Sequence, residues 1–318
     1  MKTAPLFGPY GSSALKYVDR FAQNGANAAW FHGFDPEAFD ICEQNHILPC
    51  VEFKTFRADF DEYPDLIPIG VDGRPMRYGK LVQGVCLSKK YFLDETEAHL
   101  LEGLKKFRPV GIWLDYLTYA GWFETPDPDL QETCFCPECI AEFCEATGVD
   151  ATTPAQILST AGDLWTQHKC ERVARYASRY AGMIRSVLPE CVIGAYMCPW
   201  LPDEYGGALR RIFAQDYELL TESIDVFTPL IYCTKSGKAP DWGRKFLEAA
   251  PGFVPQGRSV QLILDALEYP DSLLAAAQSA VPSRGIQVFS GDRIFSDPAW
   301  AAIFAKAVGQ IREKLSAG

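Results

Sequence analysis

The 318-residue sequence lacks the features that mark several large classes of protein. No stretch approaches about 18 uncharged apolar residues, and the N-terminus carries no apolar run typical of a signal peptide, so we expect no membrane partner. Acidic residues outnumber basic ones, which gives a formal net charge of -11, and no basic stripe is interleaved with aromatic residues. These absences argue against nucleic acid as a partner.

The sequence also lacks the common cofactor and nucleophile motifs. It contains no Gly-x-Gly-x-x-Gly, no Walker phosphate-binding loop and no Gly-x-Ser-x-Gly, so we expect no organic cofactor. The four histidines, His32, His46, His99 and His168, include no His-x-His or His-x-x-x-His pair. A catalytic metal site therefore has little support.

Cysteine is plentiful, but its pattern does not suggest a disulfide framework. The eleven cysteines are an odd number, and Cys50, Cys191, Cys198 and Cys233 lie in or beside apolar runs, where a thiol behaves as a small hydrophobic group. We therefore predict a protein of the reducing cytoplasm.

What the sequence contains is a regular alternation of apolar, β-rich runs with helical patterns, typical of a parallel sheet built from βα units. The chain is 48% hydrophobic and 13% aromatic, so it can bury a large core. We predict one α/β domain over residues 1–318, a (β/α)8 TIM barrel, and a homo-oligomer is compatible with it. The predicted strands are 5–10, which two prolines make the weakest, 27–32, 47–54, 111–117, 191–197, 225–232, 259–266 and 285–290.

Two helices and two long loops stand out between these strands. Apolar residues at three- and four-residue spacing predict a helix over 163–188, and Ser296-Asp297-Pro298 is a cap and first turn that opens the last helix. The predicted loops are 55–88 after the third strand and 118–162 after the fourth. In a barrel of this kind, the loops that follow the strands frame the active site.

Acidic and aromatic residues gather at the predicted strand ends, where barrel enzymes hold their chemistry. Carboxylates transfer protons and stabilise oxocarbenium charge, and flat rings stack on sugar faces, so this combination indicates a carbohydrate substrate. Apart from the catalytic acids, the predicted substrate-binding residues are Tyr10, His32, Glu52, Lys54, Tyr119, Trp122, Tyr196, Trp200, Tyr232, Asp292 and Arg293.

Asp115 is the strongest candidate for a catalytic residue. In the run from Gly111 to Asp115, alternation places Trp113 and Asp115 on one face, so the carboxylate opens toward the barrel mouth if Trp113 faces the barrel. Burying a carboxylate beside tryptophan without a function is costly. The structural alternative is an aspartate that pairs with Lys54 or with backbone donors.

The second catalytic carboxylate is predicted at the end of the seventh strand. Alternation from Gln261 places Asp265 on one face and Glu268 on the other, unless the strand has already ended. We prefer Asp265 to Glu268 and keep Glu52 and Glu124 in reserve.

Some of the predicted binding residues have an equally good structural interpretation. His32 can be a structural histidine at a strand end, and Glu52 can form a salt bridge with Lys54 or Arg57. Trp122, Trp200 and Tyr232 are the predicted stacking platforms, although Trp200 can also plug the barrel rim.

Three cysteines in the motif Cys134-x-Cys136-x-x-Cys139 offer soft ligands of the kind that a tetrahedral zinc site needs. The fourth ligand is predicted to be Cys86, at the end of the other long loop, with Cys144 as the competitor. A zinc ion on this set would be structural and would tie the two loops together. The alternative is a cluster of free thiols or a disulfide pair.

The same motif, followed by Phe143 and preceded by an upstream cysteine and an acid-bearing strand, resembles the family-42 β-galactosidases and related glycosyl hydrolase barrels. The resemblance is specific over roughly residues 84–143 and architectural elsewhere. It implies a TIM-barrel glycoside hydrolase in which Cys86, Cys134, Cys136 and Cys139 hold zinc.

The end of the fourth strand departs from that family and leaves two assignments of roles. Those β-galactosidases carry Asn-Glu where this chain has Leu114-Asp115-Tyr116, which is also similar to the Asp-Tyr motif of α-galactosidase-like barrels. The first resemblance implies that Asp115 is the acid/base and that Asp265 or Glu268 is the nucleophile; the second implies that Asp115 itself attacks. Carboxyl groups about 5 Å apart would retain the anomeric configuration, and groups about 6.5–9.5 Å apart would invert it.

Two other functional classes remain open at this point. A barrel can bind sugars without cleaving them, since a fold does not dictate chemistry. A sugar isomerase or aldolase is the third interpretation, and Lys54 is its only strand-end lysine.

Overall fold

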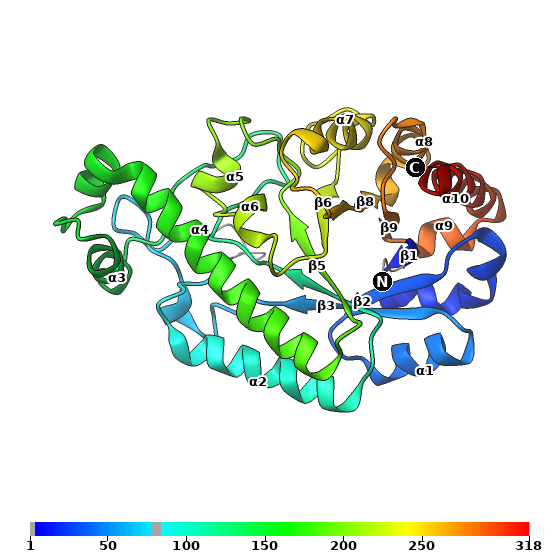
Figure 1. Ribbon diagram of the computed structural model, residues 1–318, viewed down its shortest axis with the longest axis horizontal. Coiled ribbons are helices and arrows are strands. Elements are labelled where there is room, and N and C mark those ends of the chain that lie inside the picture. Colours follow the sequence, from blue (N-terminus) through cyan, green and yellow to red (C-terminus); the bar gives the residue numbers. More distant parts are fainter. Residues whose placement is uncertain (1–3, 78–83, 318) are drawn as a thin grey trace.

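The computed structural model describes residues 4–77 and 84–317 and confirms the predicted (β/α)8 TIM barrel (Figure 1). All pairs between the strands are parallel, and pairing of β5 with β6 closes the sheet. In order around the barrel the strands are β5 (Val192–Met197), β4 (Gly111–Asp115), β3 (Leu48–Lys54), β2 (Ala28–His32), β1 (Leu6–Tyr10), β9 (Gly285–Phe289), β8 (Leu262–Asp265) and β6 (Val226–Ile231), with the short β7 (Ser259–Val260) also paired to β6.

The predicted strands are found close to their expected bounds. The first, despite its prolines, pairs with both β2 and β9. The seventh is interrupted into β7 and β8 at Gln261, whose side-chain amide donates a 2.9 Å hydrogen bond to the carbonyl oxygen of Leu6. The strand ends, and therefore the predicted site residues on them, lie at one end of the barrel.

Helices surround the barrel, and α2 and α4 pack against each other on one side of it (Figure 1). The α-helices are α1 (Pro36–Gln44), α2 (Lys90–Lys106), α3 (Pro137–Thr147), α4 (Pro154–Val187), α5 (Ala208–Arg211), α6 (Tyr217–Leu220), α7 (Trp242–Ala249), α8 (Asp271–Gln278), α9 (Asp292–Ser296) and α10 (Pro298–Ala317). Short 3-10 helices are η1 (Ser12–Arg20), η2 (Ala22–Asn24), η3 (Pro64–Leu66), η5 (Ala250–Gly252) and η6 (Ala266–Glu268). Within the described ranges, none of the helices has the length and apolar character needed to cross a membrane.

Both predicted helices are present, but the prediction of a loop over 118–162 was wrong in its second half. That segment contains α3 and the first turns of α4. Cys136 caps α3 by accepting a hydrogen bond from the Cys139 N–H, and Thr153 and Gln156 form a capping box at the start of α4. The cap of α4 follows the usual S/T-x-x-E/Q signature, which the sequence analysis overlooked, whereas the cap of α3 is a cysteine that had been assigned to the metal motif.

The barrel interior is filled by Trp113, as the alternation along β4 predicted. Its indole packs edge-on against Trp30 at a centroid distance of 5.3 Å and donates a 2.8 Å hydrogen bond to the Thr228 hydroxyl. Two glycines on the barrel lining, Gly111 and Gly194, leave room for this ring. The interior is therefore closed by a large ring beneath the strand ends, and Asp115 lies one step above it.

This packing predicts a specific sensitivity at Gly194. Gly194→Ala should lower the free energy of unfolding by about 1–3 kcal/mol, because the added Cβ would lie 2.3 Å from Trp113 Nε1. The control is Gly182→Ala on the exposed face of α4, where a Cβ meets nothing within 4 Å. That change should stabilise the protein by about 0.5–1 kcal/mol. Urea unfolding of the two variants makes the comparison, and similar effects would contradict this account of the barrel interior.

Candidate active site

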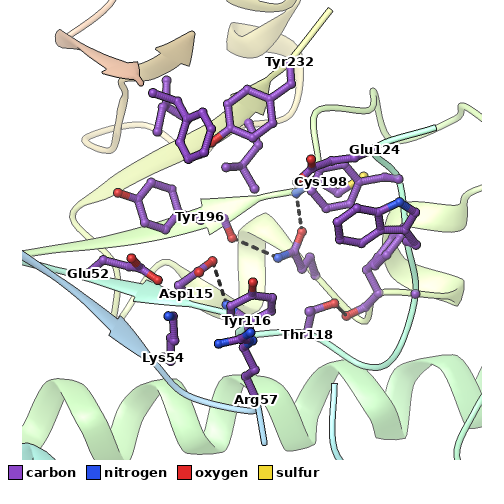
Figure 2. A pocket seen from close by; sticks show the side chains of 18 of the residues that line it. Glu52, Lys54, Arg57, Asp115, Tyr116, Thr118, Glu124, Tyr196, Cys198 and Tyr232 are labelled. Carbon is purple, nitrogen blue, oxygen red and sulfur yellow. Dashed lines mark hydrogen bonds between the residues drawn. The ribbon is translucent and has the colours of Figure 1, made fainter. Parts of the chain in front are cut away.

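A cavity of about 360 Å³ opens where the strand ends meet the segment that follows β4 (Figure 2). Its walls combine carboxylates, cations and aromatic rings from most strands of the barrel. The lining residues are Tyr10, His32, Glu52, Lys54, Arg57, Asp115, Tyr116, Thr118, Gly121, Trp122, Phe123, Glu124, Tyr196, Cys198, Phe213, Gln215, Leu230, Tyr232, Lys235, Ile263 and Phe289.

Many of the site residues predicted from the sequence meet in this cavity. Those that line it are Tyr10, His32, Glu52, Lys54, Asp115, Trp122, Tyr196 and Tyr232. Those that lie outside its lining are Tyr119, Trp200, Asp265, Glu268, Asp292 and Arg293. Trp200 is buried, with its ring against Tyr205 and Phe213 at 4.3 and 5.4 Å, which is the rim-plugging arrangement.

Sequence reasoning missed other residues of the cavity. Lys235 follows β6 by only a few positions, so a search extended slightly beyond the strand end would have included it. Arg57 begins the loop after β3 and had been considered only as a salt-bridge partner of Glu52. Gln215 had no sequence signal, because it lies in the short connection between α5 and α6. Its side chain accepts from the Cys198 N–H and donates to the Tyr196 carbonyl, bracing the end of β5.

Glu52 and Asp115 form a pair of carboxyl groups at the ends of two neighbouring strands. Glu52 is almost fully buried, at 1% exposure, and its Oε2 accepts a hydrogen bond from the Tyr10 hydroxyl and pairs with His32 Nδ1. The pairing of β3 with β4 brings Lys54 opposite Asp115. Figure 2 shows the carboxyl groups of Glu52 and Asp115 and the Lys54 side chain turned toward one another.

The environment separates the pKa values of these two acids. Burial raises the pKa of Asp115 well above its usual range, and the negative charge of Glu52 raises it further. Burial also acts to raise the pKa of Glu52, but hydrogen bonds with His32 and Asp115 outweigh it and leave that pKa below its ordinary value. The pKa values of the two acids are therefore pushed apart, and that of Asp115 is the higher.

The hydrogen-bonding of Glu52 supports the same assignment. Its second oxygen, Oε1, is buried and has no hydrogen-bond donor among the described residues when both acids are treated as ionised. A proton on Asp115 supplies a donor to Glu52. Asp115 in turn accepts a 2.9 Å hydrogen bond from the Tyr116 N–H, which fixes the orientation of its carboxyl group.

A second acidic group is held by Lys235. Its Nζ lies 3.2 Å from a carboxylate oxygen of Glu124 and 3.2 Å from one of Asp265, and it sits over the rings of Tyr232 and Phe289. Since β3 and β8 are on opposite sides of the barrel, Asp265 and Glu52 approach the site from opposite walls. Burial raises the pKa of Glu124, and the positive charge of Lys235 only partly offsets this.

The two strand-seven acids have different roles in this arrangement. The Asp265 side chain accepts from the Leu267 N–H at 3.0 Å and reaches Lys235 with its other oxygen. Glu268 accepts a 2.7 Å hydrogen bond from the Thr234 N–H and so holds the segment that carries Lys235. Of the acids around Lys235, Glu124 is the one that lines the cavity.

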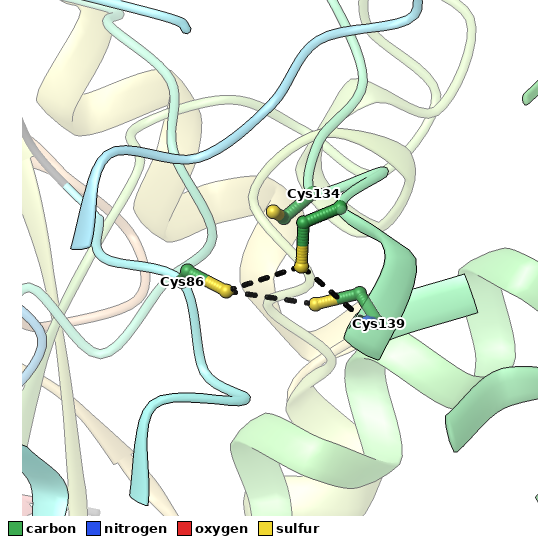
Figure 3. Close-up of side chains that lie close together, drawn as sticks. Cys86, Cys134 and Cys139 are labelled. Atoms are coloured by element: carbon green, nitrogen blue, oxygen red, sulfur yellow. Dashed lines mark hydrogen bonds between the residues drawn. The ribbon is translucent and has the colours of Figure 1, made fainter. Parts of the chain in front are cut away.

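The four cysteines predicted as metal ligands lie together, and the prediction of Cys86 rather than Cys144 as the fourth member is confirmed (Figure 3). Their sulfur atoms all lie within 4.8 Å of one another, and all four residues are buried. The Cys144 thiol instead donates to the Ala151 carbonyl. The group could therefore hold a metal ion.

Donors surround this thiol group on the side away from the cavity. The Ile69 N–H donates to Cys134 Sγ at 3.2 Å, and Arg172 lies 3.7 Å from Cys139 Sγ and forms a 2.8 Å ion pair with Glu142. The motif also has its own apolar cluster, which includes Phe135, Phe143 and Trp165 and is separate from the barrel core.

Comparison with known proteins supports the fold. No protein-family model matches the sequence, and no curated protein sequence is significantly similar to it. Among solved structures, the glycoside hydrolase domain of PgaB (BpsB) from Bordetella bronchiseptica has a TM-score of 0.72 at 11% identity, covering 95% of this chain and 98% of that one.

β-Galactosidases also share the fold. The enzyme of the Antarctic haloarchaeon Halorubrum lacusprofundi has a TM-score of 0.64 at 12% identity, and a GH42 β-galactosidase from G. stearothermophilus has 0.62 at 10%. Both comparisons cover 98% of this chain, which spans 58% and 56% of those two chains. The resemblance to family-42 barrels expected from the cysteine motif is thus confirmed at the level of fold: the chain is a barrel of the type found in these glycoside hydrolases.

Proposed function

We propose that this chain is a glycoside hydrolase. The observation that carries the proposal is the close pair Asp115 and Glu52, whose pKa values are shifted in opposite directions, in a cavity with a third carboxylate on its wall and aromatic rings around it. A neutral carboxylic acid and an ionised carboxylate are the two groups that cleavage of a glycosidic bond requires. The shared fold with glycoside hydrolases supports this proposal without assigning the residues.

In the proposed reaction Asp115 donates its proton to the glycosidic oxygen as the bond to the anomeric carbon breaks. Glu52, which is stabilised by Tyr10 and His32, remains ionised in this reaction. The proton therefore stays on Asp115 until it is transferred to the substrate. Glu124 is the proposed second carboxylate, which attacks the anomeric carbon or removes a proton from the attacking water. Asp265, the residue preferred from the sequence, then acts on Glu124 through Lys235.

Replacing Asp115 tests the central role. Asp115→Asn should reduce kcat/KM for the best glycoside substrate by at least about 100-fold, because the amide has nearly the same shape but cannot transfer the proton. Asp61→Asn, at an exposed carboxylate in the loop after β3, is the control and should stay close to wild type. Retention of more than about a tenth of the activity in Asp115→Asn, a loss of under about 1.4 kcal/mol, removes Asp115 from catalysis.

The pH dependence of kcat/KM tests the second carboxylate. Lys235 favours the ionised form of Glu124, so Lys235→Met should raise the pKa of Glu124 and move the acidic limb of the profile to higher pH by about 1 unit. The control is Lys238→Met, whose lysine pairs with Glu204 outside the cavity and should leave that limb in place. An acidic limb that does not move in Lys235→Met excludes Glu124 as the essential base.

We further propose that the four cysteines hold a structural zinc ion. A tetrahedral site with zinc–sulfur bonds of about 2.3 Å has sulfur–sulfur edges of about 3.8 Å. The sulfur of Cys86 lies 3.6 Å from that of Cys136 and 3.7 Å from that of Cys139, which fits. The positive charge of Arg172 and the Ile69 N–H favour thiolates at this position. Zinc would tie the loop after β3 to the segment after β4.

Metal analysis tests this assignment. Protein purified without chelator should contain about one zinc per chain, and Cys136→Ser should lose it and melt at a lower temperature. Cys144→Ser is the matched control, because its thiol lies in the same segment but outside the group, and it should retain the metal. Wild-type protein that is free of metal and melts normally would rule out a structural zinc.

The free state of all eleven cysteines is consistent with a reducing compartment. We infer on this basis that the protein works in the cytoplasm. The cavity and its proposed chemistry imply a carbohydrate substrate.

A further inference from the structure

Two cations on one wall of the cavity differ from the others in their partners. His32 pairs with Glu52, and Lys235 is shared between Glu124 and Asp265. Lys54 and Arg57 also line the cavity. Among the described residues, neither side chain forms a salt bridge or a hydrogen bond. The protein as a whole is acidic, with 41 carboxylate residues against 30 lysines and arginines. Two cations without an ionic partner in this cavity therefore need an explanation.

Lys54 faces an acid that does not neutralise it. It is opposite Asp115 in the register of β3 and β4, and Figure 2 shows it turned toward that side chain. Lys54 forms no salt bridge with Asp115 among the described residues, and the neighbouring Glu52 is engaged by His32 and Tyr10. The positive charge of Lys54 is therefore left over at the cavity wall.

Arg57 is held in place by a ring rather than by an acid. Its guanidinium lies over the ring of Tyr116, 5.5 Å from the centroid, and Figure 2 shows the two side chains next to each other below Asp115. Tyr116 has a backbone φ of 54°, a left-handed conformation that a residue with a bulky side chain rarely adopts. Strain of this kind is typical of functional sites. Here it places the ring where it supports the guanidinium without using up its N–H donors.

The geometry points to an anionic group on the substrate: we propose that the sugar cleaved by this enzyme is an acidic one, a hexuronic acid unit whose carboxylate binds between Lys54 and Arg57. A guanidinium fork matches a carboxylate in a bidentate arrangement, and the ammonium group adds a second charge-assisted hydrogen bond. A neutral hexose would leave both cations half-buried and unpaired. The cavity volume is at the lower end of the range for small-molecule sites and suits a site for one or two sugar units. The cleavage of an acidic sugar rests on the proposed function, whereas its binding between Lys54 and Arg57 does not.

Binding is tested with monosaccharides, so that the result does not depend on catalysis. Titrations followed by calorimetry and tryptophan fluorescence use D-glucuronate, D-galacturonate and D-mannuronate, each against its neutral hexose, with a sulfated hexose as a second source of negative charge. At least one uronate should bind at least about tenfold more tightly than its neutral counterpart. Equal affinities, binding of no uronate, or a preference for the sulfated sugar would overturn the proposal.

Variants of Arg57 locate the selectivity. Arg57→Ala should lower the ratio of uronate to neutral-sugar affinity by at least about tenfold, and Arg57→Lys should restore only part of it, because lysine keeps the charge but not the fork. Arg74→Ala, at a largely exposed arginine in the same long segment, should leave the ratio unchanged. Thermal melting confirms that each variant is folded. A ratio that is the same in wild type and Arg57→Ala contradicts the proposal.

Hydrolysis assays with p-nitrophenyl glycosides then separate this inference from the proposed function. Saturable and selective uronate binding without cleavage of any glycoside would leave the inference standing and remove the hydrolase. Cleavage of neutral glycosides with no preference for uronides would leave the hydrolase standing and remove the inference. The expected result is cleavage of a uronide with kcat/KM at least about tenfold above that of the matching neutral glycoside.

Discussion

The site depends on two carboxyl groups held close together in a buried place. Adjacent parallel strands bring Glu52, which is opposite Trp113, and Asp115, one step further along, to the same mouth of the barrel, and burial raises the cost of two negative charges there. The outcome is asymmetric because Tyr10 and His32 both contact Glu52, whereas Asp115 receives one backbone N–H. The two acids therefore differ in pKa, that of Asp115 being raised and that of Glu52 lowered.

The barrel supplies rigidity to this pair from below and from the sides. Trp113 fills the interior directly under Asp115 and is fixed by its hydrogen bond to Thr228. Gly111 and Gly194 leave room for its ring because they have no Cβ. Above the strands, the loop after β3 and the segment after β4 contribute part of the walls, and residues that follow β5 and β6 contribute the rest. The four-cysteine group joins these two segments, so the positions of Arg57, Trp122 and Glu124 all belong to stretches of chain that the group connects. The fold thus fixes the acid pair tightly, whereas the walls depend on a local tie.

Much of the fold and part of the site can be predicted from sequence periodicity, because a buried parallel strand is encoded by a continuous run of apolar residues. The alternation that turned Trp113 inward also placed Asp115 at the mouth, and the cysteine spacing indicated which thiol would join the motif. What periodicity could not provide was contact across the barrel. The pairing of Glu52 with Asp115, the bridge from Lys235 to Glu124 and Asp265, and the bracing by Gln215 each join residues that are far apart in sequence. The helix α3 lies within the long loop predicted over 118–162, although the residues around Cys144 had a helical pattern.

The separate apolar cluster around the cysteines affects which parts of this protein can tolerate substitutions. Phe135, Phe143 and Trp165 pack with the thiol group and with one another rather than with the main core, so the segment after β4 carries much of its own stability. Substitutions on the remaining surface of the segment should therefore have little effect on the stability of the barrel, and substitutions in the barrel should have little effect on the stability of the segment. Because this segment also carries Trp122 and Glu124 to the cavity, variation there changes one wall of the cavity, while Glu52, Lys54 and Asp115 stay fixed on β3 and β4.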